Sequence, residues 1–227
     1  MSHTSVLMKE VVKGLDLQTG EIFVDGTIGS AGHSLELCSD SEKKIKIIGI
    51  DGDKNRVKDS QEKLDEANCE ATVVQGNFRN IDKILDELGI KKVNKVLLDL
   101  GLNSEQLENS GRGFSFQKDE PLIMSFAPNP PFTAEEIVNE WAEESISDIL
   151  FAYGDEKFSR QIAKKIVTSR KEQKIKTTKD LVKIIEGAVP DWYKHRKIHF
   201  ATRTFQALRM TVNDELKALK EGLQNSF

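Results

Sequence analysis

Short apolar runs alternate with longer segments of helical periodicity over the first hundred residues. The apolar runs predict strands near residues 21–25, 45–50, 71–75 and 94–100. The segments between them predict helices near 32–39, 54–67 and 79–88, after a short helix near 5–14. Strands that alternate with helices form parallel sheets with right-handed crossovers. The first part of the chain therefore predicts an α/β fold.

After Gly101 the pattern changes. Residues 102–132 are rich in turn formers and prolines, which predicts a loop or linker. Helical periodicity then predicts helices near 134–141, 145–152, 155–171, 178–187 and 202–224. Thr133-x-x-Glu136 and Thr177-x-x-Asp180 have the spacing of helix-capping signals. We therefore expect a Rossmann-like domain of residues 1–109 and 201–227, with an all-helical insert at 110–200.

Composition narrows the class of protein. The chain has 227 residues, and it contains no apolar run near the roughly 20 residues of a membrane span. The N-terminus lacks the apolar stretch of a signal peptide. We therefore expect a cytoplasmic protein with no membrane partner. Cys38 and Cys69 do not have metal-ligand spacing, so we expect no metal site and two reduced, inert thiols.

Charge is distributed unevenly along the chain. Residues 1–156 carry 16 Lys/Arg and 30 Asp/Glu, whereas residues 157–209, the basic segment, carry 15 Lys/Arg and 4 Asp/Glu. A solvated helical face is one interpretation. However, aromatic residues such as Trp192 and Tyr193 lie among the cations, and rings beside cations are typical of single-stranded RNA binding. The predicted RNA-binding residues are Lys194, Arg196, Lys197 and Arg203.

Three glycines recur at every third position after the first predicted strand. They are Gly26, Gly29 and Gly32, and Asp51 closes the next strand 19 residues beyond the last of them. Glycines allow a sharp turn and close approach of a ligand, and an acid at this distance binds ribose hydroxyls in nucleotide-binding folds. A purely structural turn is the alternative. The spacing differs from the G-x-G-x-x-G of dinucleotide enzymes, which disfavours a nucleoside-binding oxidoreductase.

The carboxyl ends of the predicted strands gather further polar and aromatic residues. In a doubly wound sheet, ligands bind at this edge. Asp25, Asp51, Asn77-Phe78 and Asp99 all follow strands. Asp51 suits a ribose diol, and Phe78 could stack on an adenine ring. Each residue alone could equally form a turn or a helix cap.

Several further motifs are spread along the whole chain. They are His3-Thr-Ser-Val-Leu-Met-Lys-Glu-Val, Val24-Asp-Gly-Thr-Ile-Gly-Ser-Ala-Gly-His-Ser34, Ile48-Gly-Ile-Asp51, Gly76-Asn-Phe78, Leu97-Leu-Asp-Leu-Gly101, Ser104-x-Gln-Leu107, Arg112-Gly-Phe-Ser-Phe116, Tyr153-Gly154 and Ala201-Thr-Arg-Thr-Phe-Gln-Ala-Leu-Arg209. Together these motifs resemble the MraW family, the ribosomal RNA small-subunit methyltransferase H family. The combination of the Arg112 and Ala201 blocks is highly specific.

The resemblance implies a class I methyltransferase fold with a helical substrate-recognition domain. It also implies methyl transfer from S-adenosylmethionine to N4 of a cytosine in 16S ribosomal RNA, with the small ribosomal subunit as partner. The cofactor-binding positions that it implies are Ala31, Gly32, His33, Asp51, Phe78, Asp99 and Gln106.

The chemistry requires a group that accepts hydrogen bonds from the N4 amine, because that amine is a poor nucleophile until it is oriented. Asp99 and Asn103 are the catalytic candidates. Phe114 or Phe116 could support a cytosine that has left its stack, although both could be plain core aromatics.

The chain departs from the family pattern at several positions. Ala31 replaces a glycine, Pro121-Leu-Ile-Met-Ser125 lacks the usual Asp and Arg, and Phe200 replaces a proline. The chain stops at Phe227, where relatives continue into further strands. We therefore expect a sheet ordered 3-2-1-4 with strand 94–100 at an edge, open to pairing in a homodimer. A non-catalytic RNA-binding or assembly factor is the alternative function.

Overall fold

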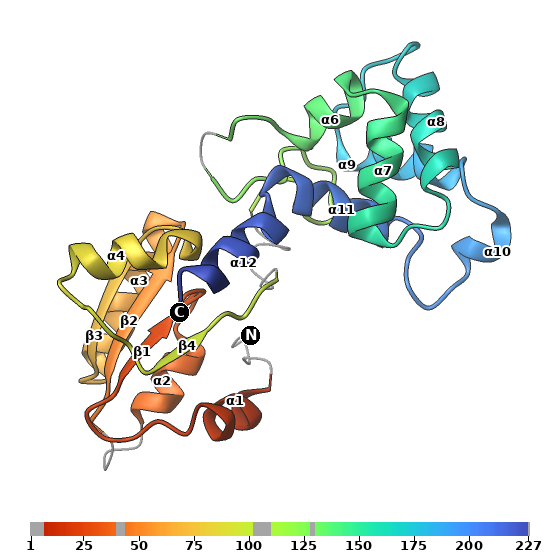
Figure 1. Cartoon of the computed structure of the whole chain (residues 1–227). Coiled ribbons are helices and arrows are strands. Elements are labelled where there is room, and N and C mark those ends of the chain that lie inside the picture. Colours follow the sequence, from red (N-terminus) through yellow and green to blue (C-terminus); the bar gives the residue numbers. More distant parts are fainter. Residues whose placement is uncertain (1–6, 40–43, 102–109, 128–129, 227) are drawn as a thin grey trace. The chain divides into compact units, whose positions relative to one another are not determined.

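The chain folds into two compact units. The computed structural model describes residues 7–39, 44–101, 110–127 and 130–226. Residues 1–101 and 216–227 form one unit, here called the sheet unit, and residues 102–215 form the other, the helical unit (Figure 1). The predicted boundaries placed residues 201–215 with the sheet, and this assignment was wrong. These residues contain α11 (Thr202–Val212), which packs against α7 (Glu143–Gly154) of the helical unit.

The sheet unit contains a parallel four-stranded sheet in the order β3-β2-β1-β4, as predicted. The strands are β1 (Ile22–Asp25), β2 (Lys46–Asp51), β3 (Glu70–Gln75) and β4 (Lys95–Leu97). The helices are α1 (Met8–Leu15), α2 (Gly32–Cys38), α3 (Lys54–Glu66), the 3-10 turn η1 (Phe78–Asn80) and α4 (Ile81–Glu87). Among the described strands β4 pairs only with β1, and it is shorter than the predicted 94–100.

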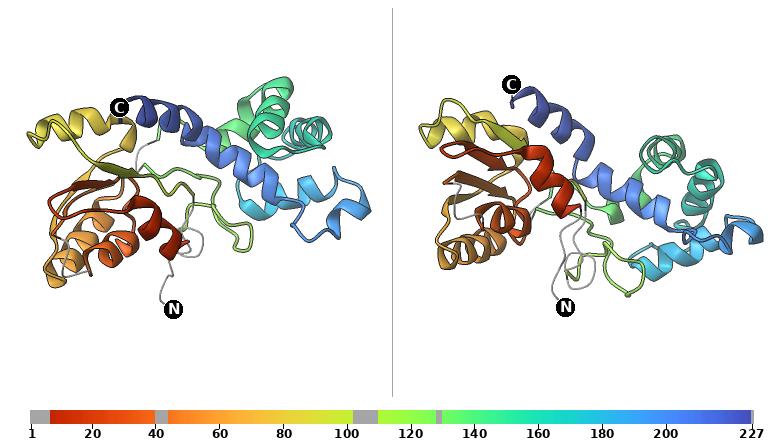
Figure 2. Two further views of the ribbon diagram at one scale, coloured as in Figure 1. Left: turned by 60° about the horizontal axis from the view of Figure 1, so that its bottom comes forward. Right: turned by 90° about the horizontal axis from the view of Figure 1, so that it is seen from below.

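Alternating side chains send the two faces of the sheet into separate cores. Phe23 and Ile47 pack with Leu37 and Leu64 of α2 and α3. The next residues along the strands, such as Ile48, point the other way and pack with Ile81 of α4. Figure 2 shows α4 on one side of the sheet and α2 and α3 on the other. A sheet covered on both faces explains why its strands are continuous apolar runs.

The helical unit surrounds a core of its own. Its helices are α6 (Ala134–Glu140), α7, α8 (Ser159–Ser169), α9 (Thr178–Glu186), the short α10 (Asp191–Lys194) and α11. Both predicted capping boxes are confirmed, since Thr133 with Glu136 and Thr177 with Asp180 satisfy each other's backbone N–H groups. In the described part of the chain, no helix has the length and hydropathy to cross a membrane.

The single helix predicted at 202–224 is two helices, α11 and α12 (Glu215–Gln224). Asn213 ends the first: its Nδ2 donates to the carbonyls of Arg209 and Met124, both at 2.8 Å, and its Oδ1 accepts from Phe126 N–H. Asp214 then adopts a left-handed φ of 50°. Periodicity missed the break because the side chain that causes it binds residues far away in the sequence.

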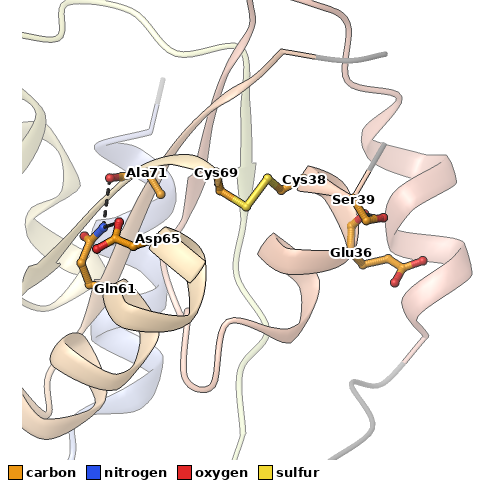
Figure 3. The surroundings of a disulfide bond; sticks show 7 residues. All are labelled: Glu36, Cys38, Ser39, Gln61, Asp65, Cys69 and Ala71. Atoms are coloured by element: carbon orange, nitrogen blue, oxygen red, sulfur yellow. Dashed lines mark hydrogen bonds between the residues drawn. A yellow bond between two sulfur atoms is a disulfide. The ribbon is translucent and has the colours of Figure 1, made fainter. Parts of the chain in front are cut away.

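Cys38 and Cys69 form a disulfide bond, so the expectation of two inert thiols was wrong (Figure 3). Cys38 is the last residue of α2, Cys69 immediately precedes β3, and their Cα atoms are 5.9 Å apart. Beside the bridge, Gln61 of α3 donates to the Ala71 carbonyl at 3.2 Å. The spacing of two cysteines along a chain cannot show that their elements meet in space.

Candidate cofactor and RNA sites

A tight turn links β1 to α2 at the carboxyl edge of the sheet. We call residues 26–32 the glycine turn. A Cβ atom on Gly26 would lie 2.5 Å from Cδ2 of Leu98 and 3.1 Å from Cβ of Phe78, so the absence of a side chain here allows close packing against the chain that follows β4. The Ile28 N–H donates to the Ile50 carbonyl at 3.1 Å. The turn is thus fixed against its two neighbouring strands.

Ala31 occupies a position that favours glycine. Its φ is 63°, its side chain is fully buried, and it immediately precedes α2. A left-handed backbone costs a residue with a Cβ about 1–2 kcal/mol. The alanine that replaces the usual glycine of the family therefore keeps the backbone conformation that glycine adopts more easily.

Asp25 anchors the glycine turn from the end of β1. One carboxylate oxygen accepts from the Ser34 hydroxyl at 2.8 Å, and the other accepts from the Thr27 N–H at 3.2 Å. Burial raises the pKa of Asp25 from 3.8 to about 6, against the lowering effect of these hydrogen bonds. Asp25 was only a strand-end candidate in the sequence, and its anchoring role required the position of Ser34.

Asp51 stands at the end of β2, as predicted. Its Oδ1 accepts from the Asp53 N–H at 2.8 Å. Burial raises the pKa of Asp51, while hydrogen bonds from the backbone of Asp53 and Gly29 and the charge of Arg56 oppose the shift. The contact with Gly29 places this carboxylate against the glycine turn, where it can accept from a bound diol.

Asp99, which follows β4, and His33, which follows the glycine turn, approach each other. His33 Nδ1 lies 4.0 Å from Asp99 Oδ2, and the Asp99 side chain is half exposed. Asp99 therefore presents a carboxylate next to the start of α2, where His33 is the second residue. Asn103 and Gln106, the other predicted site residues that follow β4, lie outside the described residues.

Phe78 begins η1 and packs against the end of the chain. A Cβ atom on Gly222 of α12 would lie 2.7 Å from Cδ2 of Phe78, so the ring and the helix are in close contact. Beside it, Arg79 forms an ion pair with Glu221 at 3.0 Å. The structure therefore assigns Phe78 a packing role that the sequence did not reveal.

The predicted RNA-binding residues are in different environments. Lys194 pairs with Asp191 at 2.9 Å, and Arg196 stacks over the rings of Trp192 and Tyr193 at 6.0 and 5.8 Å. Lys197 is exposed. Arg203 instead binds Asp155 at 2.8 Å and the last carbonyls of α7. Three of the four cations thus lie on one short segment, where Arg196 and Lys197 are exposed and Lys194 is half-buried, whereas Arg203 is part of a helix junction.

In the helical unit, the sequence analysis missed the role of Glu156 and left the roles of Phe114 and Phe116 open. Glu156 is fully buried and accepts from the Tyr193 hydroxyl at 2.9 Å, which together with burial raises the pKa of Tyr193 to about 12. Phe114 is buried and stacks on Phe126 with ring centres 5.2 Å apart, so it is a core aromatic. Phe116 stacks on His199 at 4.4 Å.

Comparison with known proteins gives the family. The model of the MraW methylase family matches residues 1–227. Ribosomal RNA small subunit methyltransferase H of Brevibacillus brevis is 44% identical over 225 residues, which are 99% of this chain and 72% of that protein. The protein of the same name from Sulfurihydrogenibium is 44% identical over 227 residues, 100% of this chain and 77% of its own.

Among solved structures, NSun6 from Pyrococcus horikoshii matches with 25% sequence identity and a TM-score of 0.36. The match covers 43% of this chain and 24% of the NSun6 chain. This likeness is too low to add to the fold described above. The match of the family model over all 227 residues and the two full-length relatives lead to one conclusion: the chain belongs to the MraW methylase family.

Proposed function

We propose that this protein transfers a methyl group from S-adenosylmethionine to N4 of a cytosine in 16S ribosomal RNA, in the cytoplasm, on the small ribosomal subunit. The observation that carries the proposal is the carboxyl edge of the sheet in a chain of this family. There the glycine turn, Asp51 and Asp99 lie at the ends of the adjacent strands β1, β2 and β4.

The residues at this edge fit the cofactor. Asp51 can accept from both hydroxyls of a ribose, and the glycine turn allows its backbone to approach a ligand closely. Ala31, Gly32 and His33 stand where α2 begins, and its first N–H groups have no partner within the helix. S-adenosylmethionine supplies an electrophilic methyl group on a sulfonium.

The chain's part in catalysis is to orient the amine. Asp99 is half exposed beside the turn and can accept a hydrogen bond from the N4 amine. This bond would align the amine and stabilise the positive charge that develops on nitrogen. The amine becomes acidic only after it has gained the methyl group, so the site needs no dedicated base. Asn103 remains a second candidate for the same contact.

The test is methyl transfer from labelled S-adenosylmethionine to small subunits that lack the modification, followed by mass spectrometry of the digested RNA. We expect N4-methylcytidine at a single position. Asp99→Asn should lower kcat more than it weakens cofactor binding, because its role concerns the amine. Transfer to another atom or another RNA would contradict the proposal.

The second candidate function is a non-catalytic RNA-binding or assembly factor. The pairing of Arg196 with Trp192 and Tyr193 supports RNA binding independently of the cofactor site. Binding of both S-adenosylmethionine and small-subunit RNA without any transfer would favour this alternative. The homodimer stays a prediction, which light scattering can test.

A further inference from the structure

The helical unit contains a cavity that the proposed chemistry does not use. Its volume is about 280 Å³, near the lower end of small-ligand pockets, which begin at roughly 300 Å³. The last turn of α7 forms one wall, and the first turn of α11 together with Ile198 forms the other. Figure 1 shows these two helices beside each other.

The walls are held by a junction that the sequence explains. Gly154 lets the backbone of α11 approach, because a Cβ atom there would lie 2.5 Å from the Arg203 carbonyl oxygen. Arg203 Nη1 then donates to the carbonyls of Gly154 and Asp155 and to the Asp155 carboxylate. A cavity bounded by such a junction is preformed.

Part of the lining is polar, and its positive and negative charges balance. The Arg203 charge is matched by Asp155 at 2.8 Å, so the cavity offers no net positive charge to a phosphate. Donors and acceptors are both present, since the amide of the exposed Gln206 carries both, and its nitrogen makes only a long contact of 3.8 Å to the Met210 sulfur. Mixed donors and acceptors in a neutral site suit the edge of a nucleobase.

The rest of the lining is apolar, and its chain position is informative. Ile198 is 55% exposed, and Tyr153 adds a ring. Ile198 directly follows the cations Lys194, Arg196 and Lys197. A strand of RNA whose phosphates contact those cations would bring a base to this cavity. Aromatic and apolar walls beside a cationic track are what proteins use for single strands.

We propose that this cavity holds one unpaired nucleobase of the RNA and so anchors the strand on the helical unit. The inference rests on the proposed function, and it adds where and how the substrate is held. The base is recognised by its edge and face, and the neighbouring phosphates are held by the exposed cations.

The experiment measures binding of a fluorescent single-stranded RNA from the methylated region to the full chain. Single abasic riboses are placed at successive positions. We expect one position at which loss of the base weakens binding at least fivefold at constant charge. Equal affinity for every abasic RNA would overturn the proposal, because charge alone would then account for binding.

Two surface variants link that position to the cavity. Gln206→Ala and Ile198→Ser change exposed lining groups and leave the Arg203–Asp155 junction intact. Each variant should bind the intact RNA about fivefold more weakly than the original protein does. In each variant, removal of the critical base should no longer weaken binding further. Gln173→Ala, which changes another exposed glutamine that does not line the cavity, is the control. An unchanged abasic penalty in both variants would place the base elsewhere and overturn the inference.

Transfer assays separate this inference from the proposed function. The cavity variants should raise KM for the small subunit and leave both kcat and the affinity for S-adenosylmethionine unchanged. The protein could lack transfer activity and still lose RNA affinity on removal of one base, in a way that depends on Gln206. That result would support base binding in the cavity and contradict only the proposed function. Full transfer activity with base-independent binding contradicts only the cavity.

Discussion

The Asp99 N–H donates a hydrogen bond to the hydroxyl of Thr27 at 2.7 Å. These two residues are 72 positions apart in sequence, and the bond ties the chain after β4 to the glycine turn. Asp25 holds the same turn through the Thr27 N–H. Thr27 therefore connects Asp99, whose carboxylate we propose binds the cytosine amine, with the glycine turn, which we propose binds the cofactor.

Thr27→Val should weaken S-adenosylmethionine binding by about 1 kcal/mol, the typical net worth of one hydrogen bond, and lower kcat as Asp99 loses its fixed position. Thr27→Ser keeps the hydroxyl and should behave like the original protein. Calorimetric titration and transfer kinetics measure the two effects. If the serine variant is as impaired as the valine variant, the methyl group of Thr27 matters and the hydrogen bond does not.

Asp51→Ala should weaken S-adenosylmethionine binding by about 1.5–3 kcal/mol, the usual loss for hydrogen bonds to a charged group. Asp59→Ala removes the same charge from an exposed position on α3 and serves as the control. Calorimetric titration compares the two. Unchanged affinity in a folded Asp51→Ala protein would remove this carboxylate from the site.

Asp25 makes stability depend on pH. Its pKa is about 6 in the folded protein and 3.8 as the ordinary value, so between these pH values the folded state holds a proton that the unfolded chain has released. Stability therefore falls as pH rises through this window, by about 2 kcal/mol between pH 4.5 and 7. Asp25→Asn should lack this component.

The measurement is urea unfolding of both proteins at the two pH values. The stability of the original protein relative to Asp25→Asn should be higher at pH 4.5 than at pH 7, and the other titrating groups cancel in this comparison. A relative stability that does not change with pH would show that burial leaves the Asp25 carboxyl unperturbed.

RNA binding should weaken with added salt, linearly on logarithmic axes. Replacing Lys194, Arg196 and Lys197 by Ala should reduce that slope by roughly three or fewer. The pairing of Lys194 with Asp191 points to the smaller value. The control replaces Lys83, Lys91 and Lys92, exposed in the sheet unit, by Ala. Equal slopes for the two triple variants would make the basic segment an ordinary solvated face.

The disulfide should stabilise the sheet unit. It closes a loop of 31 residues between α2 and β3, for which the loss of chain entropy predicts about 3–4 kcal/mol. Unfolding with and without reductant measures the difference. Cys38→Ser should match the reduced protein and should not respond to reductant. A response to reductant in that variant would point to a cause other than this bond.

The sequence by itself determined which segments of the sheet unit are strands and where several helices start, and the family resemblance implied the order of the strands. Apolar runs such as the one ending at Asp51 are strands because both of their faces are buried, which leaves a signal in every residue. The capping boxes at Thr133 and Thr177 could be predicted from the sequence because their hydrogen bonds join residues only three positions apart. The family motifs likewise lie in continuous stretches, so they could be recognised along the chain.

Only the tertiary structure decided features that join distant segments. The bonds of Asn213 to Met124 and Phe126 break the last helix, and the pairing with Asp155 places Arg203, a predicted RNA-binding residue, in a helix junction. Cys38 meets Cys69 only because α2 and the start of β3 pack together. Such contacts depend on the folded path of the chain, whereas strand and cap signals depend on neighbours in sequence.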